Sequence, residues 1–104
     1  MTATVKTQFE TAEVFIEVSS YANNGTLAIQ LWCEDGPFAT LTVNIMDKHR
    51  EGCQYVDTNN CPWAEKFIHD YNLGEPTGNY GMSGFCLYPE YKFNIEELTK
   101  YDMF

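Results

Sequence analysis

Four cysteines and two histidines are the residues of this chain best suited to metal binding or nucleophilic chemistry. Cys53 and Cys61 are eight residues apart, His49 precedes Cys53 by four residues, and His69 follows Cys61 by eight. Structural zinc sites are usually built from two closely spaced pairs of ligands, and the sequence contains no CxxC pair. We therefore predict four reduced thiols in structural positions, with no metal and no cofactor.

Two features could support enzyme chemistry. Cys61 begins a predicted helix, where the helix dipole would favour the thiolate. His69 would lie about 12 Å further along the axis of the same helix, which is too far for a catalytic base. Gly78–Gly84 is rich in glycine, but neither a helix nor a nearby lysine follows it, as a phosphate-binding loop requires. We favour a non-enzymatic protein, and the alternative is a small enzyme or ligand-binding module using Cys61 or the Gly78–Gly84 segment.

The chain is strongly acidic, with 15 Asp and Glu against 6 Lys and Arg and a net charge of −9. This balance opposes direct binding to nucleic acid or to an anionic membrane, because both would repel the protein. The carboxylates fall mostly on predicted helices, strands and tight turns. They form either an ordinary solvated surface or a surface that imitates a polyanion and binds the basic groove of a nucleic-acid-binding protein.

The first half of the sequence alternates between apolar and polar residues, which is typical of strands. Asn23-Asn24-Gly25 and the Glu34–Pro37 segment are turn signals between these strands. The predicted strands are antiparallel and cover residues 13–18, 26–33, 38–46 and 54–57.

Helical spacing replaces this alternation after Asn60. Apolar residues at 63, 64, 67, 68 and 71 share one helix face, with Asn60 as the N-cap, Pro62 in the first turn and Gly74 past the end. Residues 74–84 contain too many glycines for regular structure. A last strand over 85–93 contains Pro89, which predicts an edge position. Asn94 is expected to cap a short helix over 95–100.

These elements predict one α+β domain covering residues 1–104. It consists of an antiparallel sheet of four or five strands, one helix packed on a face of the sheet, and a short C-terminal helix. The helix should lie on the apolar face formed by Val14, Ile16, Leu27, Ile29, Leu41 and Val43.

The opposite face of the sheet is the candidate partner-binding surface. Phe15 and Trp32 could enter a pocket on a partner while carboxylates meet its Lys or Arg side chains. The alternative is that a second layer of structure covers these aromatic residues. The full set of candidate contacts is Glu13, Phe15, Glu17, Gln30 and Trp32 on the strands, with Glu34 and Asp35 at the adjacent turn.

Several longer stretches together resemble a known family. They are residues 20–31, 38–44, 55–60, 73–78 and 83–89. The chain resembles small domain-of-unknown-function proteins carried on conjugative elements and phages of Gram-positive gut bacteria. The resemblance implies an accessory protein of a mobile element, and such elements often encode acidic inhibitors of host restriction or CRISPR nucleases. It therefore implies, as a partner, a host defence protein with a basic surface.

The sequence also predicts a cytoplasmic location. Its longest apolar stretches are far shorter than the roughly 18 residues of a membrane helix. Its first residues lack the basic region and apolar core of a signal peptide. The sequence does not indicate an oligomeric state.

Overall fold

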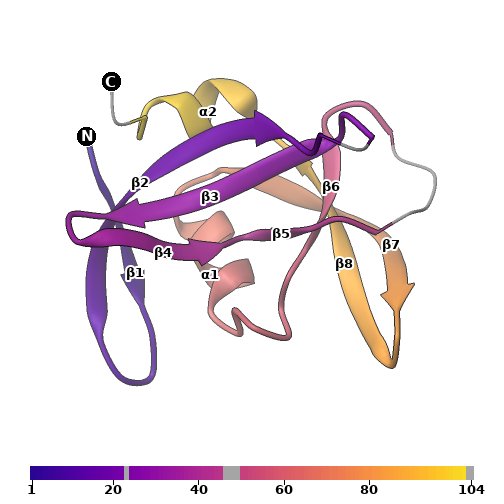
Figure 1. Cartoon of the computed structure of the whole chain (residues 1–104), viewed down its shortest axis with the longest axis horizontal. Coiled ribbons are helices and arrows are strands. Elements are labelled where there is room, and N and C mark those ends of the chain that lie inside the picture. The colour runs from indigo at the N-terminus through magenta and orange to yellow at the C-terminus, as the bar shows by residue number, and fades with distance from the viewer. Residues whose placement is uncertain (23, 46–49, 103–104) are drawn as a thin grey trace.

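The computed structural model describes residues 1–22, 24–45 and 50–102. These residues form two antiparallel sheets of four strands each and two short helices (Figure 1). The predicted α+β class is therefore confirmed. The strands are divided between two sheets rather than gathered in one, because two strands that the sequence did not indicate, β1 and β7, complete them.

The first sheet has the strand order β1-β2-β3-β4. Its strands are β1 (Ala3–Lys6), β2 (Thr11–Ser20), β3 (Leu27–Cys33) and β4 (Gly36–Thr40). Gly25 and Gly36 lie at the two predicted turns with φ of 70° and 134°, a region that L side chains rarely adopt. The predicted strands within residues 13–40 are confirmed, and Asn23 lies outside the described residues.

The second sheet has the order β5-β6-β8-β7. It consists of β5 (Thr42–Val43), β6 (Cys53–Val56), β7 (Gly74–Ser83) and β8 (Cys86–Phe93). Residues 74–84 are thus mostly strand, which corrects the prediction of an irregular segment. The pairing with β8 holds this glycine-rich stretch extended, although its own residue types are poor strand formers.

Pro89 does not mark an edge strand, because β8 lies between β6 and β7. The pairing of β6 with β8 ends at Tyr55 opposite Glu90, one residue before the proline would be reached. Pro89 therefore stands where β8 has only one paired neighbour, and its missing N–H disrupts no bond to β6.

Leu41 forms the corner between the sheets. Its N–H donates to the Ile29 carbonyl at 2.9 Å, and its carbonyl accepts from the Asp57 N–H at 2.9 Å. The strand predicted over 38–46 is therefore divided into β4 and β5, and its last residue, Met46, lies outside the described residues. The helix α1 (Ala64–Asp70) contacts both β1 and β7, which are the outer strands of the two sheets.

The α1 helix buries Ala64, Phe67 and Ile68, as its spacing predicts, and exposes its charged residues. It is shorter than predicted at both ends. Asn60 does not cap it, because the Asn60 side chain donates to Asp57 at 2.9 Å instead. Asn72, not Gly74, takes the left-handed position just past the end of the helix.

Asn72 adopts a φ of 55°, and its N–H donates to the His69 carbonyl. The N–H of the next residue, Leu73, reaches back to the Ile68 carbonyl at 2.9 Å. This pair of bonds is a Schellman motif, in which asparagine takes the left-handed position that is usually glycine. Asn94 caps α2 (Ile95–Thr99) as predicted, accepting a bond from the Glu97 N–H. Neither helix has the length or the apolar character to cross a membrane.

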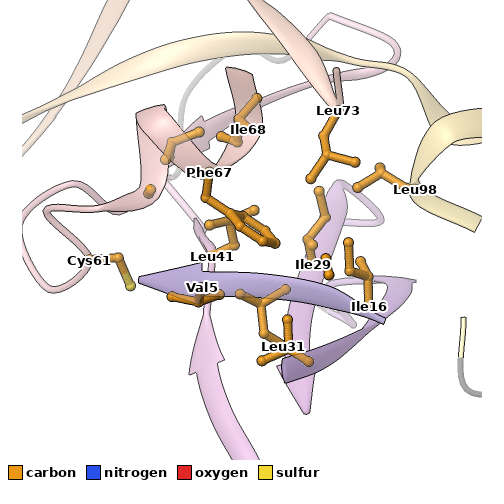
Figure 2. Packing of buried hydrophobic residues seen from close by; sticks show 14 of the residues in the cluster. Val5, Ile16, Ile29, Leu31, Leu41, Cys61, Phe67, Ile68, Leu73 and Leu98 are labelled. Carbon is orange, nitrogen blue, oxygen red and sulfur yellow. The ribbon is translucent and has the colours of Figure 1, made fainter. Parts of the chain in front are cut away.

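The main core joins the first sheet, α1 and α2, and β6 and β8 of the second sheet add Val56, Tyr91 and Phe93 to it (Figure 2). Phe67 and Ile68 of α1 and Leu98 of α2 point toward Ile16, Ile29 and Leu31 of the first sheet, and all six are buried. A second, smaller cluster joins Ile45, Tyr55 and Tyr88, with Val43 and Cys86 packed against it. This second cluster supports the outer half of the β7–β8 hairpin.

Candidate functional site

The predicted contact residues on β2 and β3 lie on one face of the first sheet. Phe15 is directly opposite Trp32, and Glu17 is directly opposite Gln30. Residues that pair across two strands share a face, and Glu13 joins them because it is two residues from Phe15 on the same strand. Glu34 and Asp35 form the two-residue turn between Cys33 and Gly36.

Hydrogen bonds fix several of these side chains. The Trp32 indole Nε1 donates to Glu17 Oε1 at 3.1 Å, and Thr2 Oγ1 donates to Glu13 Oε1 at 3.2 Å. Gln30 Nε2 donates to the Ala39 carbonyl at 2.9 Å, and Gln30 Oε1 accepts from a threonine hydroxyl. The amide of Gln30 therefore links β3 to β4, and its polar atoms have partners within the sheet.

The remaining six residues form what we call the acidic face: Glu13, Phe15, Glu17, Trp32, Glu34 and Asp35. Its four carboxylates are exposed. Phe15 and Trp32 are half-buried, and neither belongs to the two core clusters. Lys6 is the one cation on the strands of this sheet. The face thus combines fixed aromatic area with an excess of negative charge.

An apolar groove borders the acidic face. It has a volume of about 530 Å³ and is lined chiefly by Phe9, Pro37, Phe38, Pro62 and Trp63. The rings of Phe38 and Trp63 lie 5.9 Å apart, and Pro37 pairs with Trp32 across the β3–β4 ladder. No local sequence pattern indicates this groove, because its walls come from three separate segments.

Cys61 is buried, and its Sγ lies 3.7 Å from the Thr40 carbonyl. Burial, with a smaller contribution from the charge of Asp57, raises the pKa of the Cys61 thiol to about 11. The thiol is therefore protonated at neutral pH, which does not favour a nucleophile. Because α1 begins at Ala64, Cys61 stands before the helix rather than in its first turn.

The residues considered for zinc do not form a site within the described part of the chain, where no three His, Cys, Asp or Glu residues gather closely enough to hold a metal. His69 is exposed on α1, and His49 lies outside the described residues. The structure has Cys33, Cys53, Cys61 and Cys86 as free thiols.

The Gly78–Gly84 segment belongs to β7 except for Gly84, which lies in the turn, and its first residues form an irregularity beside a carboxylate. Between Pro76 and Tyr80, β7 has two more residues than the paired stretch of β8. Glu90 Oε1 accepts bonds there from Thr77 Oγ1 at 2.7 Å and from Asn79 Nδ2 at 3.3 Å. A carboxylate at this position would repel a phosphate, so the segment does not suit phosphate binding.

Sequence reasoning missed a set of exposed apolar residues on the β7–β8 hairpin. They are Tyr80, Met82, Phe85 and Leu87. The signal that could have shown them is charge, because residues 76–89 include no Asp, Glu, Lys or Arg.

The fold and these surfaces define a small α+β domain with an acidic, aromatic face. A family described as a domain of unknown function, DUF4313, matches residues 15–103, and the chain belongs to this family. Neither a curated protein nor a solved structure matches the chain.

Proposed function

We propose that this protein is a non-enzymatic protein-binding module whose acidic face contacts a basic surface of a partner protein. The observation that carries the proposal is the hydrogen bond between Trp32 and Glu17 on that face. It holds a large aromatic side chain in one orientation on the surface, beside a carboxylate that still faces solvent.

Such an arrangement suits protein recognition for two reasons. Tryptophan is enriched among the residues that dominate binding energy, and a side chain already held in place loses less entropy on binding. Carboxylates around an aromatic anchor attract a basic partner and accelerate association. The neighbouring groove at Pro37 offers further apolar area to the same partner.

We infer further that the partner is a nucleic-acid-binding defence protein of a bacterial host, inhibited by imitation of a polyanion. Support comes from the net charge of −9 and from the mobile-element context that the sequence resemblance implies. Glu13 and Glu17 are four residues apart on a strand, or about 13 Å, whereas duplex DNA carries a charge about every 1.7 Å. Carboxylates at this spacing need the aromatic contacts as well to compete with DNA.

Two observations weigh against the alternative of a small enzyme or ligand-binding module. The Cys61 thiol is buried with a raised pKa, and the Gly78–Gly84 segment is occupied by strand pairing and by Glu90.

The proposal is tested by affinity capture from a bacterial lysate with matched charge variants. Glu17→Lys/Glu34→Lys changes the acidic face, and Glu75→Lys/Glu96→Lys changes exposed carboxylates elsewhere. Both pairs move the net charge from −9 to −5, since each exchange adds two charges. We expect a basic protein to be retained by the parent and by the second pair but lost with the first. Equal retention by both pairs would contradict a role for the acidic face.

A further inference from the structure

We propose that the β7–β8 hairpin is a self-association surface through which two copies of this chain form a two-fold symmetric dimer. The hairpin has two distinct faces. Met82 pairs with Leu87, and Tyr80 pairs with Pro89, so these residues share one face. Phe85 lies in the turn at the tip.

The apolar face is unusually exposed for its residue types. The exposed fractions are 65% for Tyr80, 67% for Met82 and 58% for Leu87, and Phe85 is fully exposed at 108%. Isolated exposed apolar residues are normal on a protein surface, but a contiguous set on one projecting element marks an interaction site.

The opposite face of the hairpin is packed against the body of the protein. A Cβ added to Gly81 would lie 2.7 Å from Tyr55 Cε1 and 2.9 Å from Ile45 Cδ1, so only glycine permits this approach. Tyr88 and Cys86 pack in the same small cluster. The apolar face is therefore held outward on a fixed support, and it cannot turn inward to cover itself.

Charge identifies a second copy as the occupant. Two chains of net charge −9 repel one another over most of their surface. Residues 76–89 carry no charged side chain, and the nearest in sequence, Glu75 and Glu90, stand at the base of the hairpin. Glu90 is also buried and paired with Arg50. Two hairpin faces can therefore meet without bringing carboxylates together.

The available area agrees with a weak dimer. The four exposed side chains offer roughly 500 Å² per copy, taking about 150–250 Å² for each complete aromatic side chain. A standard specific interface buries about 800 Å² per partner, so the hairpin face supplies the larger part of what is needed. A two-fold contact brings the same patch of both copies together, and a patch of methionine, leucine and aromatic side chains is compatible with itself.

Sedimentation equilibrium over a range of protein concentrations tests this proposal with three proteins: the parent, Met82→Lys/Leu87→Lys and Phe9→Lys. The double variant alters only exposed side chains, and its circular dichroism spectrum, compared with that of the parent, checks that it is folded. Phe9 is a matched control, because it is an exposed aromatic residue at 88% in the β1–β2 turn.

We expect the parent and Phe9→Lys to rise from 12.0 kDa toward twice that mass with concentration, while the double variant stays at 12.0 kDa. Added salt should strengthen the dimer, because it screens the repulsion between the acidic chains. A parent that stays monomeric at every concentration would overturn the proposal and assign the hairpin to an apolar surface of another protein. Dimerisation of the double variant to the same extent as the parent would overturn it as well.

Discussion

Glu90 is the carboxylate whose surroundings differ most from those of the acidic face. Its side chain is almost completely buried, and Arg50 Nη2 lies 2.6 Å from its Oε1. Burial alone would raise the pKa of Glu90, but the hydrogen bonds from Thr77, Arg50 and Asn79 outweigh it and lower that pKa. This one oxygen thereby holds the two extra residues of β7 against β8.

The lowered pKa makes the stability of the fold depend on pH. A carboxyl group whose pKa is lower in the folded than in the unfolded state stabilises the fold above its unfolded pKa, about 4.3 for glutamate. That contribution is lost as the pH falls through the lower, folded value. For Glu90→Gln we expect a loss of about 1–3 kcal/mol at pH 7 and a weaker decline of stability in acid. Urea unfolding of the parent and of Glu90→Gln, from pH 7 into the acid range, measures the free energy of unfolding at each pH. Identical pH profiles of the two proteins would contradict this role for Glu90.

For the thiol of Cys61 and the carboxylate of Glu90, the surroundings could not be predicted from the neighbouring sequence. The sequence predicts that Cys61 begins a helix, whereas α1 begins three residues later, and the pKa of the Cys61 thiol depends on burial by distant segments. The Glu90 network likewise joins residues 13 and 40 positions apart, and no local pattern connects them.

At the scale of the elements, α1 is the helix that contacts an edge strand of each sheet. Phe67 is 4% exposed, and its ring lies 6.0 Å from that of Trp63 and 5.4 Å from that of Tyr71. Tyr71 in turn accepts a 2.7 Å bond from the Thr4 N–H on β1. Phe67 and the flanking Trp63 and Tyr71 form a row of rings, and Tyr71 joins the end of α1 to the edge strand of the first sheet.

Truncation of this aromatic row should be costly. We expect Phe67→Ala to destabilise the fold by about 3–5 kcal/mol, a large share of the roughly 5–15 kcal/mol that stabilises a small domain. His69→Ala is the control, because His69 is exposed on the same helix. Its urea midpoint should stay near that of the parent. An unchanged midpoint for Phe67→Ala would show that the ring does not contribute to the core in solution.

Local sequence patterns predicted those elements in which apolar residues recur at one regular spacing. Alternation in β2 and β3 and helical spacing in α1 were both correct, because each element buries one continuous face. The β1 strand has only four residues, too few to establish a period. The glycines and the proline of β7 do not predict a strand, and this segment is extended because it pairs with β8. The corner at Leu41 depends on bonds to two different segments, which alternation alone cannot show.

At the scale of the whole molecule, two surfaces of opposite character lie on different sheets. The acidic face belongs to the first sheet and the apolar hairpin to the second, and their turns point to different sides of the molecule (Figure 1). The dependence on salt concentration distinguishes binding through the acidic face from association through the hairpin. It should weaken binding through the acidic face and strengthen association through the hairpin, since the first depends on charge attraction and the second is opposed by charge repulsion.

The most direct test of the proposed function measures how the captured partner binds as salt is raised and as duplex DNA is added. If the acidic face imitates a polyanion, affinity should fall steeply with salt, and DNA should displace the partner without itself binding to this protein. Glu17→Lys/Glu34→Lys should already bind weakly at low salt, whereas Glu75→Lys/Glu96→Lys should behave like the parent. A partner that stays fully bound at high salt and in excess duplex DNA would contradict the account.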